Sequence, residues 1–458
     1  MQMSEFYFEP LYKNMIRSVL EYAIPIYHEE GSKTKDFDKI QNKGLRIAMG
    51  YRTTTPINVM HAKAGLMRIQ QRVELLAERY NIRQIAGKKS EENINLLENR
   101  IFKREERFKE EWDDYTFTNA ILTEEGKIKQ RNNSINDHTL MNIIREKLRI
   151  KENKPTIIFI DGSKAEEGRA NEIGIITKEN DCWKEEGISI DNRMSIYTTE
   201  AIALSKSMEK AKQEYPNKAV IILSDSESVI KAITKGFPKK GENSWIIKIM
   251  KQPKNCCKRR QNNREGGHRL GIAWIPAHMG IEGNERADRI AKEKTRNDHY
   301  IEFKIPEEDL IRNAEEEAWK RSRNKNKEEG THKGIKYLNS GVSNNNKKTP
   351  WFTTVSSLER KSIVTLSRIR VNHYNLNESL ERKNLVNSAE CECGHGVQDI
   401  DHVIWQCPMN EEQRRILENQ LEHRGIDRGV PVMDILKANQ PANLRLIAAF
   451  INKLGRTI

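Results

Sequence analysis

Long apolar runs and cysteines are scarce in this sequence, and each scarcity excludes a class of protein. No stretch approaches the roughly 18 to 20 uninterrupted apolar residues of a membrane span. The first residues do not combine a basic region with an apolar core, so we expect no signal peptide. Six cysteines in 458 residues are too few for a disulfide framework. We therefore expect an intracellular protein, in the nucleus or the cytoplasm, with no membrane partner.

The charge balance is basic. Lysine and arginine number 79 against 66 aspartate and glutamate residues, which gives a net charge of +13 and a pI near 9.2. Such an excess suits a polyanionic partner such as nucleic acid. The alternative is that the charge only keeps the chain in solution, and composition leaves both open.

Composition changes along the chain and predicts five segments. They are a helical segment (1–95), a charged helical linker (96–152), a segment of alternating β-rich and helical runs (153–296), a polar helical linker (297–380) and a helical tail with a Cys/His cluster (381–458).

The middle segment carries the clearest pattern. Short β-rich runs at 156–160, 172–177, 182–190, 219–224 and 269–275 predict strands, and the stretches at 196–214, 226–235 and 284–294 between or after them predict helices. This order is typical of an α/β fold, here a mixed five-stranded sheet with helices.

Four acidic residues stand at marked places in that segment. Asp161 and Asp225 each close an apolar run, Glu200 shares a helix face with Leu204, and Asp288 lies on the last helix. Taken singly, a hairpin turn, a helix cap and a helix-dipole contact are alternatives for Asp161, Asp225 and Glu200 in that order. Together the four carboxylates could converge on a pair of divalent metal ions, an arrangement that hydrolyses phosphodiesters.

Four stretches extend this hypothesis to a family. They are Ile160–Ser163 (IDGS), Thr199–Leu204 (TEAIAL), Ser224–Ser226 (SDS) and Trp274–Asp288 (WIPAHMGIEGNERAD). The segment resembles the ribonuclease H domain of non-LTR (jockey/R1/I-like) retrotransposon reverse transcriptases.

That resemblance implies hydrolysis of the RNA strand of RNA–DNA hybrids with two Mg²⁺ ions about 4 Å apart. Asp161 would bridge both ions, Glu200 and Asp225 would hold one, and Asp288 would hold the other. His278 would assist proton transfer or product release, and the products would carry a 3′-hydroxyl and a 5′-phosphate.

Contacts to nucleic acid are expected at two places. Ser163 and Asn284 lie inside the family motifs. The others belong to a basic insertion before the last strand and are Lys254, Lys258, Arg259 and Arg260. The insertion corresponds to a substrate-gripping protrusion of some relatives, and a solvated loop is the alternative.

Residues 9 to 85 are similar to the region after the polymerase palm of the same elements, in pieces such as Gln41–Arg46 and Gly50–Pro56. The only adjacent aspartates, Asp113 and Asp114, lie in a charged helix-like stretch, so we predict no polymerase activity. The chain then corresponds to the back half of a retrotransposon polyprotein. A catalytically idle, nucleic-acid-binding remnant is the alternative, and a DNA-cutting integrase is a third hypothesis.

The cysteines of the tail predict a metal site. Cys391, Cys393, His402 and Cys407 have the residue types that Zn²⁺ takes in a tetrahedral set, with His395 as a competing ligand. Buried thiols without metal are the alternative. The array resembles the knuckle-like element of the same retrotransposon proteins, which follows a stretch similar to Arg368–His373 here. Cys182 and the Cys256–Cys257 pair have no partner at metal spacing.

Overall fold

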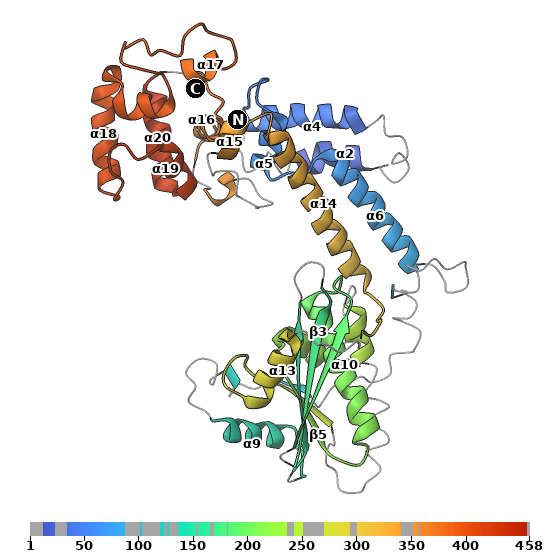
Figure 1. Ribbon diagram of the computed structural model, residues 1–458. Coiled ribbons are helices and arrows are strands. Elements are labelled where there is room, and N and C mark those ends of the chain that lie inside the picture. Colours follow the sequence, from blue (N-terminus) through green and yellow to red (C-terminus); the bar gives the residue numbers. More distant parts are fainter. Residues whose placement is uncertain are drawn as a thin grey trace. The chain divides into compact units, whose positions relative to one another are not determined.

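The structure is a computed structural model. It describes residues 12–22, 34–87, 101–102, 120–122, 126–127, 136–152, 154–164, 169–180, 182–235, 242–250, 270–293, 300–339, 351–355 and 358–455. They form two compact units, which we call the sheet unit (Asn81–Asn313) and the terminal unit (Met1–Tyr80 with Ala314–Ile458) (Figure 1). Within the described ranges, no helix has the length and apolarity needed to cross a bilayer.

The sheet unit is built on one mixed sheet. Its strands are β1 (Ala120–Ile121), β2 (Thr156–Ser163), β3 (Asn171–Glu179), β4 (Cys182–Ile190), β5 (Val220–Ser224) and β6 (Leu270–Trp274). They lie in the order β1-β6-β5-β2-β3-β4, with β2, β3 and β4 antiparallel and β2, β5, β6 and β1 parallel. The predicted α/β fold is confirmed, with six strands instead of five. The extra strand is two residues long and pairs with β6 across the sequence, so no local pattern announces it.

Helices cover both faces of this sheet. They are α9 (Asp137–Lys147), α10 (Ile196–Glu214), α11 (Glu227–Thr234) and α13 (Glu282–Lys292). Figure 1 shows α10 on one side of the strands and α9 with α13 on the other. A hydrophobic core lies between the sheet and the helices α9 and α13, and it includes Leu140, Ile144, Phe159 and Ala287. α9 therefore belongs to the folded layer, although it lies in the segment whose composition predicted a charged linker.

Sheet burial explains why the strands end where polar residues begin. All five residues of β5 are buried, and Ile158 and Ile160 of β2 are fully enclosed. Because both faces of the sheet are covered at β2 and β5, these strands are near-continuous apolar runs. In these two strands a charged side chain fits only at the end, whereas the exposed strand β4 carries Lys184, Glu185 and Glu186 in its middle.

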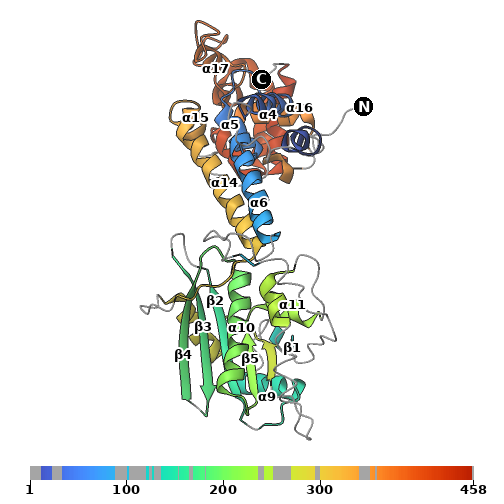
Figure 2. The ribbon, with the colours of Figure 1, turned by 90° about the vertical axis from the view of Figure 1, so that its right-hand side faces the viewer.

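The terminal unit is helical (Figure 2). Its elements are η2 (Tyr12–Arg17), α2 (Ser18–Glu21), α4 (Thr34–Met49), α5 (Ile57–Ala64), most of α6 (Ile69–Gly87), most of α14 (Glu307–Gly330), α15 (Ile335–Asn339), η5 (Trp351–Thr354), α16 (Arg360–Arg370), α17 (Asn377–Glu381), η6 (His402–Gln406), η7 (Pro408–Asn410), α18 (Glu411–Glu422), α19 (Val432–Ala438) and α20 (Pro441–Lys453).

The two ends of the chain share one hydrophobic core in this unit. Tyr51 and Met60 from the N-terminal part lie in the same buried cluster as Trp351, Leu366 and Phe450. The two parts are separated by about three hundred residues, so the N-terminal helices complete the fold of the C-terminal ones. The five segment boundaries expected from composition stay a prediction.

Candidate active site and metal centre

Two carboxylates come together because two parallel strands end side by side. Ile160 of β2 pairs with Ser224 of β5, and Asp161 and Asp225 are the next residues on each chain. The carboxyl ends of parallel strands meet at one edge of a sheet, so this register alone places the two side chains as neighbours. Asp161 remains within β2 and is 7% exposed. Its Oδ1 accepts a hydrogen bond of 2.9 Å from the amide of Gly162.

The third carboxylate enters from α10. Ser195 caps this helix by accepting a hydrogen bond from the amide of Thr198, which fixes Glu200 in the second turn. Gly162 leaves room for the approach, since a Cβ there would lie 3.1 Å from the amide nitrogen and 3.3 Å from Cδ of Glu200. Oxygens of Asp161, Glu200 and Asp225 lie within 4.8 Å of one another.

Burial and mutual repulsion change the acidity of this cluster. Burial, helped by the charges of Asp225 and Asp288, raises the pKa of Asp161 to about 7. Burial raises the pKa of Glu200 well above its usual value, and the charges of Asp161 and Asp225 add to this. Burial also raises the pKa of Asp225, although the hydrogen bond from Asn284 opposes the shift.

The same cluster fits a divalent cation. Glu200 is 8% exposed, and its buried Oε2 has no hydrogen-bond partner in the described part of the chain. A buried carboxylate oxygen without a partner is costly. Oxygen donors on rigid elements are the ligands that Mg²⁺ prefers. A cation between the three carboxylates would offset their repulsion and would give Oε2 of Glu200 a partner.

Asp288 and His278 lie at the other end of the site. Ligand atoms of His278, Glu285 and Asp288 lie within 4.8 Å of one another, and Lys292 holds Asp288 by an ion pair of 2.6 Å. The charge of Asp288 also helps to raise the pKa of Asp161, so the two groups of acids influence each other. His278 is exposed on the loop before α13. The sequence did not single out Glu285 or Lys292, although spacings of three and four from Asp288 on a helix could have done so.

Helix α13 packs close to the sheet because two of the contact positions, Gly174 and Gly283, are glycines. A Cβ at Gly174 of β3 would lie 2.2 Å from the carbonyl oxygen of Ala287. A Cβ at Gly283 would meet the ring of Phe159 at 2.2 Å. The position of Asp288 therefore depends on small residues that carry no chemistry themselves.

The single-residue alternatives do not match the local structure. Asp161 is paired inside a strand and not in a turn. The N-cap of α11 is Ser226, so the carboxylate of Asp225 is not used as a cap. Glu200 lies beyond the first turn of α10, which contains no acidic residue.

The expected nucleic-acid contacts fall in different places. Asn284 is 1% exposed, and its Nδ2 donates a hydrogen bond of 3.2 Å to Oδ2 of Asp225, so it orients a site carboxylate. Ser163 is half-buried at the end of β2. The basic insertion, with Lys254, Lys258, Arg259 and Arg260, lies outside the described residues, as do Cys256 and Cys257.

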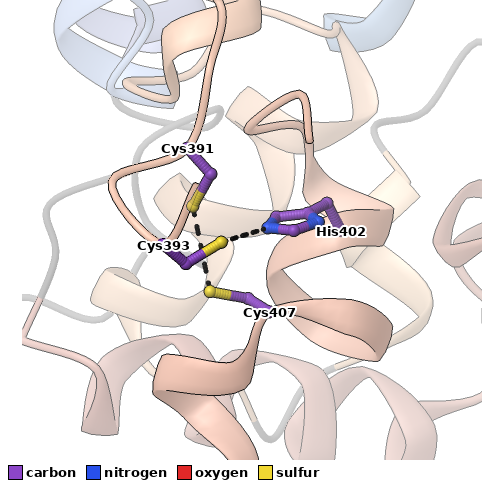
Figure 3. A group of neighbouring side chains, drawn as sticks. All are labelled: Cys391, Cys393, His402 and Cys407. Atoms are coloured by element: carbon purple, nitrogen blue, oxygen red, sulfur yellow. Dashed lines mark hydrogen bonds between the residues drawn. The ribbon is translucent and has the colours of Figure 1, made fainter. Parts of the chain in front are cut away.

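A second candidate metal centre lies in the terminal unit (Figure 3). Ligand atoms of Cys391, Cys393, His402 and Cys407 lie within 4.8 Å of one another. The Sγ atoms of Cys391 and Cys407 are 3.8 Å apart, and Sγ of Cys393 is 3.3 Å from Nε2 of His402. His395 is exposed and its Nδ1 contacts the carbonyl oxygen of Cys393, so it is not part of the group.

The backbone around these residues is shaped for the cluster. Glycines at 394 and 396 have positive φ and allow the tight turn that carries Cys391 and Cys393. Asp399 accepts a hydrogen bond of 2.8 Å from the amide of His402 and fixes the start of that segment. The sulfur atoms of Cys391 and Cys393 thus face the imidazole of His402, at the start of η6, and the sulfur of Cys407, directly after η6. Such a set suits Zn²⁺.

Comparison with known proteins identifies the family of a segment within the sheet unit. Residues 153–296 match the family model described as RNase H. A ribonuclease H of Pseudomonas aeruginosa (strain LESB58) is 26% identical over 140 residues, which are 30% of this chain and 89% of that protein. A ribonuclease H of Jannaschia sp. (strain CCS1) is 28% identical over 125 residues, 27% of this chain and 74% of that protein. Residues 153–296 are therefore a ribonuclease H domain.

Proposed function

We propose that the ribonuclease H domain hydrolyses the RNA strand of RNA–DNA hybrids and needs Mg²⁺ to do so. The observation that carries the proposal is the convergence of Asp161, Glu200 and Asp225 within 4.8 Å, with a buried oxygen of Glu200 left without a partner. The similarity to ribonucleases H supports the reaction class. Discrimination for RNA would come from contacts to 2′-hydroxyls.

Each side chain has a role in this proposal. Asp161, Glu200, Asp225 and Asp288 would hold the two metal ions. When bound, the ions supply charge stabilisation at the phosphate and activate water for in-line attack. Asn284 keeps Asp225 oriented through its hydrogen bond, and Lys292 does the same for Asp288. His278 is exposed beside Asp288 and would move a proton or help the product to leave.

We further assign Zn²⁺ to Cys391, Cys393, His402 and Cys407 as a structural ion. All four ligand positions would be filled by protein, which leaves no open position for catalysis. Three of these four residues are buried, which also fits a structural role.

The flanking segments support an origin in a non-LTR retroelement. The N-terminal stretch that is similar to the region after a polymerase palm shares its core with the tail that carries the Cys/His cluster. The two parts would have been retained together because neither buries its apolar face alone. A catalytically idle remnant is the second candidate function, and the same assay decides it.

The decisive experiment is cleavage of an end-labelled RNA–DNA hybrid by the full chain with Mg²⁺. Asp161→Asn removes a charge from the centre of the site, and we expect the rate to fall at least about a hundred-fold. Asp434→Asn is the matched control, because Asp434 is exposed on α19 in the other unit. Hybrid-specific cutting by wild type and control supports the proposal. Binding without cutting by the wild type would identify an idle remnant.

A further inference from the structure

Two sequence stretches that the nuclease does not use meet in the terminal unit. The loop Gly50–Pro56 lies against the end of α16 and the residues that follow it. Oγ1 of Thr54 and Oγ1 of Thr55 are each 3.3 Å from Nδ1 of His373. Nε of Arg368 donates a hydrogen bond of 2.7 Å to the carbonyl oxygen of Gly50. Their residues are separated by about 320 positions in the chain, so the fold alone brings them together.

Cationic side chains gather around this contact. We call them the basic cluster: Arg52, Arg368, Arg382 and Lys383, near His373. Burial, followed by the charges of Lys383, Arg382 and Arg52, lowers the pKa of His373 to about 3. The imidazole is therefore neutral and adds no further positive charge to the cluster.

The cations repel one another. Burial and then the charges of Arg382 and Arg52 lower the pKa of Lys383 to about 8. Burial, together with the charge of Arg52, lowers the pKa of Arg368 as well. Glu378 is an acid at this place, but it lies 3.8 Å from Arg382 and also binds Lys336 outside the cluster. Positive charge exceeds negative charge here.

Donors are also left over. In the part of the chain that the structure describes, the buried Nζ of Lys383 and the buried Nε of Arg52 have no hydrogen-bond partner. A buried cationic donor without a partner is costly. Arg382, Thr53 and Thr54 are exposed, so a solute can reach the cluster from the solvent.

We propose that the basic cluster binds a phosphate group of a nucleic-acid backbone. Guanidinium groups and an ammonium suit phosphate oxygens, and the exposed threonines add neutral donors. The choice of nucleic acid over another polyanion rests on the proposed function, since a hybrid nuclease must hold a polyphosphate chain. The site lies outside residues 153–296, so it would add affinity that the ribonuclease H domain does not supply itself.

Affinity of the full, zinc-loaded chain for a hybrid tests this inference. The probe is a fluorescent 20-base-pair hybrid with a 2′-O-methylated RNA strand, which keeps every phosphate but is not cut. Arg52→Gln with Lys383→Gln should weaken binding about ten-fold. It should also lower the slope of log affinity against log salt by about one to two. Arg424→Gln with Lys453→Gln removes the same charges from exposed positions in the turn after α18 and at the end of α20, and should change affinity less than two-fold.

Three results separate the possibilities. Equal affinity and equal salt slope for the two double variants would overturn the inference, whatever the cleavage assay shows. A large loss for the cluster variant stands even if the wild type cuts no hybrid, so the two proposals fail separately. Displacement of the labelled hybrid by polyglutamate at concentrations as low as unlabelled hybrid would indicate an acidic protein partner, and would also overturn it.

Folding is checked with Lys383→Met. An ammonium that lacks a partner contributes little to the free energy of unfolding, so the thermal midpoint without nucleic acid should not fall. If the midpoint drops while hybrid affinity stays at the wild-type value, Lys383 has a structural role and the inference is wrong.

Discussion

Single residues in the active site are arranged for function at a cost in stability. Glu200 brings a buried carboxylate next to two others, and its Oε2 has no partner among the described residues. Without metal, this side chain adds repulsion to the folded state and none to the unfolded state. Stability and activity should therefore respond in opposite directions to its replacement.

Glu200→Gln is the test at this scale. The amide removes one charge and can donate a hydrogen bond to Asp161, so the metal-free protein should become more stable by about 1 kcal/mol, or about 2–4 °C in the midpoint. Cleavage should be lost, because a metal ligand is lost. Thermal unfolding in metal-free buffer measures the first effect. Glu214→Gln, at the exposed end of α10, is the control. A lower midpoint for Glu200→Gln than for this control would contradict the argument.

At the scale of elements, helix α13 can pack close to β3 because Gly174 has no side chain. The carbonyl of Ala287 occupies the space that a side chain at Gly174 would need. Gly174→Ala should push α13 away from β3 and move Asp288 with it, although neither Gly174 nor Ala287 takes part in chemistry. We expect a ten-fold or greater loss of cleavage at a modest loss of stability.

A glycine of another strand provides the comparison. A Cβ at Gly271 of β6 would meet the side chain of Leu148, which can shift, at 2.6 Å. Gly271→Ala should therefore keep its cleavage rate while it loses a similar amount of stability. Rates and unfolding midpoints of the two variants, measured together, decide the point. Equal rates would show that α13 tolerates the displacement.

Elements of the sheet unit were predictable because buried strands and helices need apolar residues at regular positions in the sequence. Apolar runs ended by Asp161 and Asp225 predicted strands, and β2 and β5 contain those runs. Strand β1 was missed since two residues carry no period. The role of Asn284 was missed because its hydrogen bond to Asp225 joins two elements and needs the fold first, whereas the ion pair of Lys292 with Asp288 lies within α13 at a spacing of four.

Pairing of distant elements was the other limit. The helical segment predicted at 1–95 needs a partner for its apolar residues, but the sequence does not identify that partner. The structure places Trp351 and Phe450 against apolar residues of this segment, through contacts that span most of the chain. The four thiol and imidazole ligands were recoverable because they lie within seventeen residues, whereas the basic cluster was not.

At the scale of the whole molecule, two units with separate cores should unfold separately. The Cys/His cluster belongs to the terminal unit, so binding of Zn²⁺ is linked to the folding of that unit. Removal of zinc by a chelator should lower one thermal midpoint and leave the midpoint of the sheet unit unchanged when Mg²⁺ is restored.

The zinc content of single-residue variants tests which side chains bind the ion. The full chain should bind about one zinc ion, and Cys407→Ser should lose it together with the stability of the terminal unit. His395→Asn should keep it, because that imidazole is turned toward a backbone carbonyl, and Cys182→Ser on β4 is the thiol control. Elemental analysis and calorimetry are the measurements. Loss of zinc from His395→Asn would mean that His395 is a ligand. A chain that binds no zinc would identify the cluster as buried thiols, and the terminal unit would then rest on the core that its two ends share.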